Sequence, residues 1–222
     1  MATLELKNIS VRFGGLLALS EISFSINSGE ILGLIGPNGA GKTTIFKVLT
    51  GVYPASSGDV LFNGESILGR RPHEIFKSGI ARTFQNIRLF ANMTAVENAL
   101  VARHCRSKKG VVGAILRTRS QKREEQQIRA DASEALSFMG VEKFADTVSS
   151  NLPYGHQRRL EIARALSSKP RVLLLDEPAA GMNPAESAKL MKDISRISEL
   201  GVDVLLVEHD MKVVMGVCSR IV

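Results

Sequence analysis

The sequence contains two cysteines and no long apolar run, and each absence excludes a class of protein. Cys105 and Cys218 lie far apart and form no Cys-x-x-Cys pattern, so a disulfide framework or a zinc site has little support. No run of eighteen or more apolar residues occurs, and the opening MATLELKNIS lacks the basic and then apolar pattern of a signal segment. We therefore expect a cytoplasmic chain that does not itself cross a membrane.

The sequence also lacks internal repeats and low-complexity linkers, as expected of a single domain. It has 222 residues, of which 44% are hydrophobic. This length and composition suffice for one substantial core, at the upper end of the size of a single domain. Extensive disorder is therefore disfavoured.

The net charge of +7 comes from one segment. Residues 103–129 contain nine Lys or Arg and two Glu, and this local excess of seven equals that of the whole chain, 29 minus 22. A single basic segment favours a local interaction surface or a solvated helix face over a basic groove that binds nucleic acid along its length. We expect no nucleic-acid partner, and both other interpretations remain open.

The first part of the chain has the alternation of half-buried strands. LELKNISVRF and ISFSI alternate with a period of two, and DVLFNGESI predicts a hairpin that turns at Asn63 and Gly64. Three continuous apolar runs, ILGLI (31–35), VLLLD (172–176) and VDVLLVE (202–208), predict buried parallel strands. The pattern predicts an α/β fold with a small antiparallel sheet at the front.

The middle of the chain is expected to be helical. Thr94 and Glu97 form a capping-box pattern ahead of AVENALVAR, and a second helix is expected from about Arg119 to Met139, ending at Gly140. The basic stretch between these helices contains two glycines, at 110 and 113, and is expected to be a loop or a broken helix.

The stretch GPNGAGKTT follows the strand ILGLI and precedes a helical pattern, as the P-loop G-x-x-x-x-G-K-[ST] requires. Backbone N–H groups and the start of the helix near Gly41 would face the phosphates, Lys42 would reach the β- and γ-phosphates, and Thr43 would hold Mg²⁺. The candidate nucleotide-binding residues of the loop are Gly36, Pro37, Asn38, Gly39, Ala40, Gly41, Lys42, Thr43 and Thr44.

Two other strand ends carry residues suited to hydrolysis. Asp176 and Glu177 end the run VLLLDE, where Asp176 would orient Mg²⁺ or its waters and Glu177 would act as a general base on the attacking water. His209, in VEHD, follows the third strand and could donate a hydrogen bond to the γ-phosphate. The sequence thus predicts a Mg²⁺-dependent nucleotide hydrolase.

With these motifs in this order, the whole chain resembles the ATP-binding subunits of ABC transporters. The resemblance implies that Phe13 stacks on adenine, although Phe13 could equally fill the edge of the front sheet, and that Gln85, in TFQNIRLF, contacts Mg²⁺ and senses the γ-phosphate. The Asn-Lys-x-Asp motif of GTPases is absent, and a tandem ABC protein would need a second P-loop.

The stretch LPYGH matches the position of the family's signature, Leu-Ser-Gly-Gly-Gln, with three substitutions. Its residues are Leu152, Pro153, Tyr154, Gly155 and His156. The resemblance implies that the signature directs a helix start near His156 at ATP bound by a second ATPase subunit. Pro153 has no hydroxyl, so one charge-assisted hydrogen bond of about 1.5 to 3 kcal/mol is lost or replaced.

The motifs RTFQNIRLF, EPAAGMNP and EHDMKVVMG are similar to those of importer ATPases for branched-chain amino acids. ATPases of importers for urea and other amides are similar. An importer ATPase for urea, other amides or other amino acids is therefore an alternative, and so is an ABC ATPase that acts as a nucleotide-gated scaffold without transport. Asn183 replaces an aspartate in a loop that, in the family, contacts the other subunit. ABC-type repair ATPases have long heptad insertions, which this chain lacks.

The resemblance implies a β-rich front at about 1–30 and 58–68, an α/β core at about 31–92 and 156–222, and a helical subdomain at about 93–155. It also implies a second ATPase subunit, two multi-span permease subunits that contact the helical insertion at the cytoplasmic face of the membrane, and, indirectly, a substrate-binding protein. Because family members usually continue beyond the switch histidine, we expect the chain to be truncated at its C-terminus.

Overall fold

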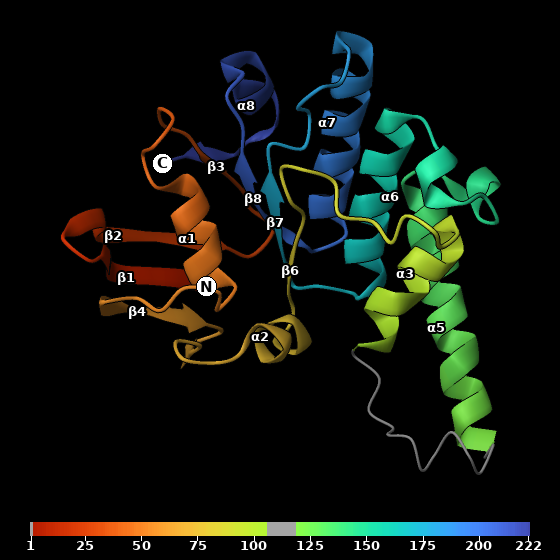
Figure 1. Ribbon diagram of the computed structural model, residues 1–222, viewed down its shortest axis with the longest axis horizontal. Coiled ribbons are helices and arrows are strands. Elements are labelled where there is room, and N and C mark those ends of the chain that lie inside the picture. The colour runs from red at the N-terminus through yellow and green to blue at the C-terminus, as the bar shows by residue number, and fades with distance from the viewer. Residues whose placement is uncertain (1, 106–118) are drawn as a thin grey trace. The chain divides into compact units, whose positions relative to one another are not determined.

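The computed structural model describes residues 2–105 and 119–222, and the chain divides into two compact units. The first unit combines Met1–Gln85 with Arg171–Val222, and the second is Asn86–Pro170. Figure 1 shows both sheets in the first unit and the helices α3, α5 and α6 in the second. Residues 106–118 of the basic segment at 103–129, which include both of its glycines, lie outside the described residues.

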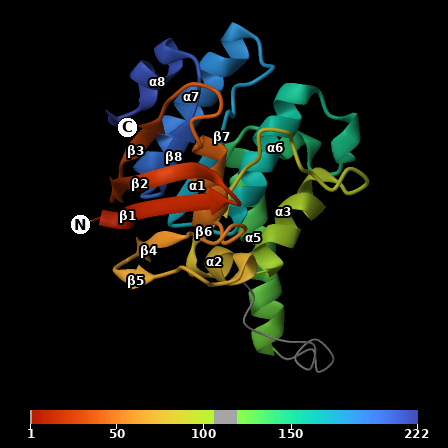
Figure 2. The same ribbon diagram turned by 60° about the vertical axis from the view of Figure 1, so that its left-hand side comes forward.

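The front of the first unit is an antiparallel sheet with the strand order β2-β1-β4-β5 (Figure 2). Its strands are β1 (Ala2–Phe13), β2 (Leu16–Asn27), β4 (Ser57–Phe62) and β5 (Glu65–Ser66). The predicted hairpin is confirmed, since Asn63 and Gly64 join β4 to β5 with φ angles of 51° and 82°. β2 is longer than the pattern ISFSI because it pairs with β1 along its full length, and register shifts interrupt the alternation.

The second sheet is parallel, with the strand order β6-β7-β8-β3-β9. Its strands are β3 (Ile31–Leu34), β6 (Ile80–Arg82), β7 (Val172–Asp176), β8 (Asp203–Val207) and β9 (Arg220–Ile221). The three apolar runs are confirmed as parallel strands, and every residue of β3, β7 and β8 is buried. β9 was not predicted, because two residues are too few to show a period.

Helix α1 (Lys42–Leu49) packs into the same hydrophobic core as both sheets. The core joins Leu4 of β1, Phe46 of α1, Leu174 of β7 and Leu205 of β8, each with no exposed surface. The other helices of this unit are α2 (Pro72–Ser78), α7 (Pro184–Glu199) and α8 (Met211–Val217). This packing holds the loop before α1 at the carboxyl end of β3.

The second unit is helical. Its helices are α3 (Ala95–His104), α5 (Arg119–Phe138) and α6 (Tyr154–Ser167), with short 3-10 turns at Glu142–Phe144 and Ser149–Asn151. The capping box at α3 is confirmed, because Thr94 accepts a hydrogen bond from the backbone of Glu97 and the Glu97 carboxylate accepts one from the backbone of Thr94. α5 ends as predicted, just before Gly140, which has a φ of 67°.

Helix α6 begins at Tyr154, two residues before the start expected near His156. Pro153 is the N-cap, and its carbonyl accepts hydrogen bonds from the backbone N–H groups of His156 and Gln157. The earlier start follows from the proline ring, which presets φ and lacks an N–H that a helix start would leave unpaired. Within the described residues, no helix has the length and apolar character needed to span a membrane.

Candidate active site

The P-loop connects β3 to α1 and depends on Gly41. Gly41 is the N-cap of α1 and has a φ of 92°. A Cβ at this position would clash with the side chain of Leu19 and lie 3.1 Å from the carbonyl oxygen of Ala18. Glycine therefore lets the loop pass close to β2, and the amide groups at the start of α1 remain available to an anion.

The ammonium group of Lys42 lies inside this loop. Its Nζ donates hydrogen bonds to the carbonyl oxygens of Gly36 and Pro37, the latter at 2.9 Å, and the residue is 8% exposed. Thr43, the next residue along α1, is exposed. The loop thus presents a positive charge, backbone donors and a hydroxyl group together, which is the set of groups that phosphate and a phosphate-bound Mg²⁺ require.

Asp176 ends β7 and is nearly buried, with 6% of its side chain exposed. Its Oδ2 forms an ion pair with Nη2 of Arg82, at 2.9 Å, and the side chain of Arg82 is 9% exposed. Arg82 ends β6, the neighbouring strand. Arg82 was not among the site residues predicted from the sequence. The signal that could have identified it is a charged residue at the end of the short apolar strand before Gln85.

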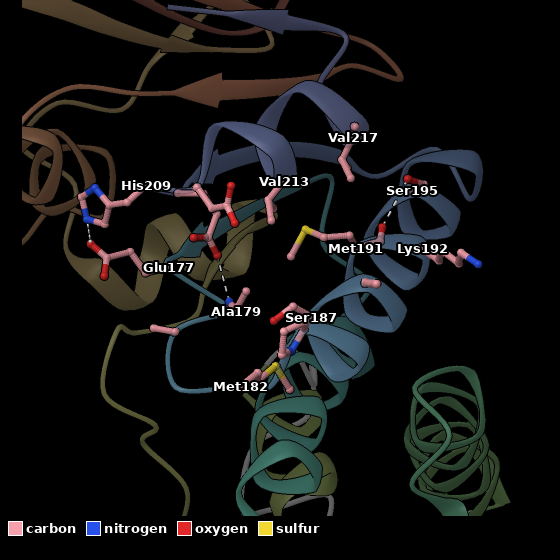
Figure 3. Close-up of a pocket in the computed structure, with 16 residues that line it drawn as sticks. Glu177, Ala179, Met182, Ser187, Met191, Lys192, Ser195, His209, Val213 and Val217 are labelled. Carbon is pink, nitrogen blue, oxygen red and sulfur yellow. Dashed lines mark hydrogen bonds and ion pairs between the residues drawn. The ribbon is translucent and has the colours of Figure 1, made fainter.

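The structure brings Gln85, Glu177 and His209 together around one carboxylate. The amide Nε2 of Gln85 donates to Oε2 of Glu177 at 2.8 Å, and Nε2 of His209 is hydrogen-bonded to Oε1. With Nε2 as the donor, His209 holds one oxygen of the carboxylate and Gln85 holds the other. Figure 3 shows the contact between Glu177 and His209, which come from loops after β7 and β8.

Phe13 lies at the end of β1 and is 44% exposed. Its ring meets the ring of Tyr53 edge to face, with 5.0 Å between the centroids. Nζ of Lys47 lies 3.1 Å from the Tyr53 hydroxyl and 4.6 Å from the centroid of its ring. The exposed ring of Phe13 therefore rests on a second aromatic residue, which the sequence did not indicate.

The signature stretch lies in the second unit. Leu152 is buried and its carbonyl accepts a hydrogen bond from Nε2 of Gln157 at 2.8 Å. Tyr154 is 45% exposed, Gly155 is buried, and the ring of His156 packs edge to face on Phe144 at 4.7 Å. The half-exposed ring of Tyr154 thus lies in the first turn of α6.

Comparison with known proteins identifies the family. The family model "ABC transporter" matches residues 19–180. The chain belongs to the ABC transporter family.

Two curated relatives extend this family resemblance over nearly the whole chain. The high-affinity branched-chain amino acid transport ATP-binding protein BraF of Pseudomonas aeruginosa is 44% identical over 220 residues, which cover 99% of this chain and 86% of BraF. The corresponding protein LivG of Escherichia coli K12 is 43% identical over 219 residues, which cover 98% of this chain and 86% of LivG.

A solved structure supports the same assignment. It is the ADP conformation of an ATP-binding cassette of an ABC transporter, and it matches with a TM-score of 0.85 at 30% identity, covering 100% of this chain and 86% of that chain. The predicted fold, an ABC-type P-loop ATPase core with an antiparallel front sheet, is confirmed. The chain is an ABC ATPase, which binds and hydrolyses ATP.

A cavity of about 630 Å³ lies beside Glu177 and His209 in this ABC ATPase. It is bounded by α7, α8 and the loop that joins β7 to α7, and Figure 3 shows Met182, Met191 and Val213 among its lining residues. The carboxylate of Glu177 therefore lies at the margin of a mainly apolar space.

Glu208 adds a second carboxylate at this cavity. It is 6% exposed, and it accepts a hydrogen bond from the backbone N–H of Ala179 at 2.8 Å. Burial raises the pKa of Glu208 above its ordinary value, hydrogen bonds from the backbone of Ala179 and His209 oppose the rise, and the nearby charge of Glu177 adds to it. The sequence did not distinguish this residue from the other charges at strand ends.

Asn183 caps α7. Its side chain accepts a hydrogen bond from the backbone N–H of Glu186 at 2.9 Å, and the carboxylate of Glu186 accepts one from the backbone of Asn183. The side-chain oxygen of Asn183 thus accepts a hydrogen bond from the chain's own helix. The predicted contact of Asn183 with another subunit did not take this hydrogen bond into account.

Mg²⁺ fits the groups around the P-loop as a partly hydrated ion. Within the described residues, no group of three or more His, Cys, Asp or Glu side chains could hold a metal by itself. Mg²⁺ is commonly held by one or two protein oxygens, waters and substrate phosphates, and a Thr43 hydroxyl beside a phosphate-binding loop suits that mode.

Proposed function

We propose that the chain is the ATP-hydrolysing subunit of a membrane importer for branched-chain amino acids. The observation that carries this proposal is the identity of 44% with BraF over 99% of the chain. The arrangement of Gln85 and His209 around Glu177 supplies the chemistry that such a subunit needs.

In the proposed nucleotide site, the loop 36–44 binds the phosphates. Lys42 would move its ammonium group from the carbonyls of Gly36 and Pro37 to the β- and γ-phosphates, since both arrangements lie within reach of its flexible stem. Thr43 would hold Mg²⁺, with Asp176 and Gln85 binding its waters. Phe13 would stack on the adenine, supported from below by Tyr53.

Glu177 is the proposed general base. Its carboxylate would accept a proton from the attacking water. His209 would donate a hydrogen bond to the γ-phosphate, and Gln85 would sense the γ-phosphate. His209 would turn its Nε2–H from Oε1 of Glu177 to the γ-phosphate when ATP binds, which leaves Oε1 to accept the proton while Gln85 still holds Oε2.

A second ATPase subunit, identical or different, would complete each site. The stretch 152–156 would act on ATP held by that subunit, through the amide groups at the start of α6 and the exposed ring of Tyr154. Closure on ATP and opening after hydrolysis would drive two multi-span permease subunits, which we place against the helical unit at the cytoplasmic face of the membrane. A substrate-binding protein would act on the far side.

Hydrolysis is tested with the purified chain and Glu177→Gln. The chain should hydrolyse Mg-ATP, and Glu177→Gln should bind ATP, lose hydrolysis and shift to the mass of a dimer in light scattering, because its sites close but do not turn over. A variant that still hydrolyses ATP at the unmodified rate would exclude Glu177 as the base. A chain that binds ATP and stays monomeric and inactive would show that a different second ATPase is needed.

The solute is tested in the source organism. Removal of the coding sequence should abolish high-affinity uptake of labelled leucine, isoleucine and valine and leave urea uptake unchanged, and Lys42→Ala supplied on a plasmid should fail to restore it. Loss of urea uptake with normal leucine uptake would contradict the proposed solute and support the importer of urea or amides.

A further inference from the structure

The ion pair between Arg82 and Asp176 joins two neighbouring strand ends. β6 and β7 are parallel neighbours, and Arg82 lies opposite Leu174, two residues before Asp176. The arginine side chain therefore runs along the edge of the sheet to the carboxylate, where Nη2 and Oδ2 are 2.9 Å apart. Both side chains are at least nine-tenths enclosed, so water does not screen the pair effectively.

Two aromatic rings fix the guanidinium of Arg82. Its Cζ lies 5.2 Å from the ring centroid of Phe46 and 5.0 Å from that of Phe84. Phe46 belongs to α1, the helix that begins at the P-loop, and has no exposed surface. Arg82 is therefore in contact with the phosphate-binding helix, with the end of β7 and with the segment that leads to Gln85.

Stability is a poor explanation of this arrangement. A buried ion pair is often no more stable than apolar residues of the same size, because both charges lose their hydration. In addition, Nε of Arg82 is buried without a hydrogen-bond partner in the described part of the chain. The guanidinium is thus placed to suit Asp176 and the two rings, with one of its own donors left unsatisfied.

We propose that Arg82 is a positioning residue that holds the carboxylate of Asp176 for the Mg²⁺ of the nucleotide site. The inference rests on the proposed role of Asp176. The ion pair uses Oδ2, so Oδ1 is not required for it and can accept a hydrogen bond from a metal-bound water. Partners of this kind fix the direction of a metal-binding carboxylate, and their loss typically weakens metal affinity about 10- to 100-fold.

The experiment measures Mn²⁺ binding, by electron paramagnetic resonance, to the full chain saturated with ADP. Arg82→Met, which keeps an apolar stem between the rings, should weaken Mn²⁺ binding about 10- to 100-fold, and Arg82→Lys, which keeps the charge without the planar fork, should give a smaller loss. Affinity for ADP measured in EDTA should change less than about twofold, because the P-loop itself is intact. Arg171→Met, an exposed arginine of the same unit, is the matched control.

The outcomes separate this inference from the proposed function. If Asp176→Asn leaves Mn²⁺ affinity unchanged, the role of Asp176 itself is wrong. If Asp176→Asn weakens Mn²⁺ binding and the Arg82 variants do not, Arg82 is a structural residue and the inference is overturned. Tighter Mn²⁺ binding by Arg82→Met would overturn it as well, since Arg82 would then compete with the metal. Should Arg82→Met not fold, Arg82→Lys decides, with its folding checked by a cooperative thermal transition.

Discussion

Single side chains in this ABC ATPase are placed by contacts with residues far away in the sequence. Phe13 is the clearest case, because an exposed aromatic residue at a strand end could either fill the sheet edge or bind a base. The ring of Tyr53, which is itself held by Lys47, packs against one side of Phe13, and 44% of Phe13 remains exposed. This arrangement favours a platform for adenine.

Phe13→Ala should weaken ATP binding and leave the binding of inorganic triphosphate unchanged, because only ATP has a base to stack. Stacking on an aromatic side chain contributes about 1 to 3 kcal/mol per base, which corresponds to roughly 5- to 150-fold in affinity. Competition with a fluorescent ATP analogue measures both ligands. Tyr53→Phe, which keeps the supporting ring, is the control, and equal losses for ATP and triphosphate in Phe13→Ala would refute the stacking role.

Glu208 gives a prediction on pH. Burial raises the pKa of Glu208 above the ordinary value of 4.5, so the folded state favours the protonated form. The charged form of Glu208 therefore lowers the free energy of unfolding increasingly as the pH rises above 4.5 and through the folded pKa. Glu208→Gln keeps an acceptor for the N–H of Ala179 and removes the charge. It should therefore raise the urea midpoint more at about pH 8 than at about pH 5. A gain that is equal at both values would contradict the argument.

At the scale of elements, the N-cap of α7 gives a prediction on stability. Asn183→Ala should lower the free energy of unfolding by about 0.5 to 2 kcal/mol, because the N–H of Glu186 loses its side-chain acceptor. Asn183→Asp is the matched control, since aspartate caps equally well and suits the helix dipole. Urea unfolding measures both variants, and an unchanged midpoint in Asn183→Ala would exclude the cap as a source of stability.

The start of α6 gives the second prediction for an element. Pro153 is the N-cap and offers no side-chain hydrogen bond. Pro153→Ser in the Glu177→Gln background should strengthen ATP-dependent dimerisation, because a serine hydroxyl adds a hydrogen bond to a charged phosphate worth about 1.5 to 3 kcal/mol. Sedimentation with and without ATP measures the dimer constant. A weaker dimer would show that the proline-defined start of α6 matters more than the hydroxyl.

For the whole molecule, the positive charge concentrates in residues 103–129 and suggests a contact with anionic lipid head groups. Replacing the four basic residues by Gln should weaken binding to vesicles with anionic lipid, by about 1 kcal/mol for each residue near the surface. The residues are Arg117, Arg119, Lys122 and Arg123.

Vesicle flotation at low and physiological salt measures the effect. The matched control replaces four basic residues outside the segment, Arg12, Lys77, Lys189 and Lys192, and thus removes the same net charge. Equal losses of vesicle binding in both variants would show that only the net charge matters. Unchanged binding in the first variant would exclude the proposed lipid contact.

Local sequence patterns determined the elements and the inventory of the site. The P-loop, the apolar runs of β3, β7 and β8, the capping box of α3 and the hairpin at Asn63 and Gly64 each depend on residues adjacent in the sequence, where spacing and φ preference act directly. The same patterns placed Glu177 and His209 at strand ends, and parallel strands bring such ends to one edge.

Only the tertiary structure decided the partners of these residues. Arg82 and Asp176 are 94 residues apart, and they meet because β6 and β7 pair as parallel neighbours although residues 86–170, the whole second unit, separate them in the sequence. Phe13 also meets Tyr53, and Glu208 meets Ala179, across segments that are distant in the sequence. Contacts of this kind depend on how strands and loops pack across the whole unit, and no periodicity or short spacing in the sequence records that packing.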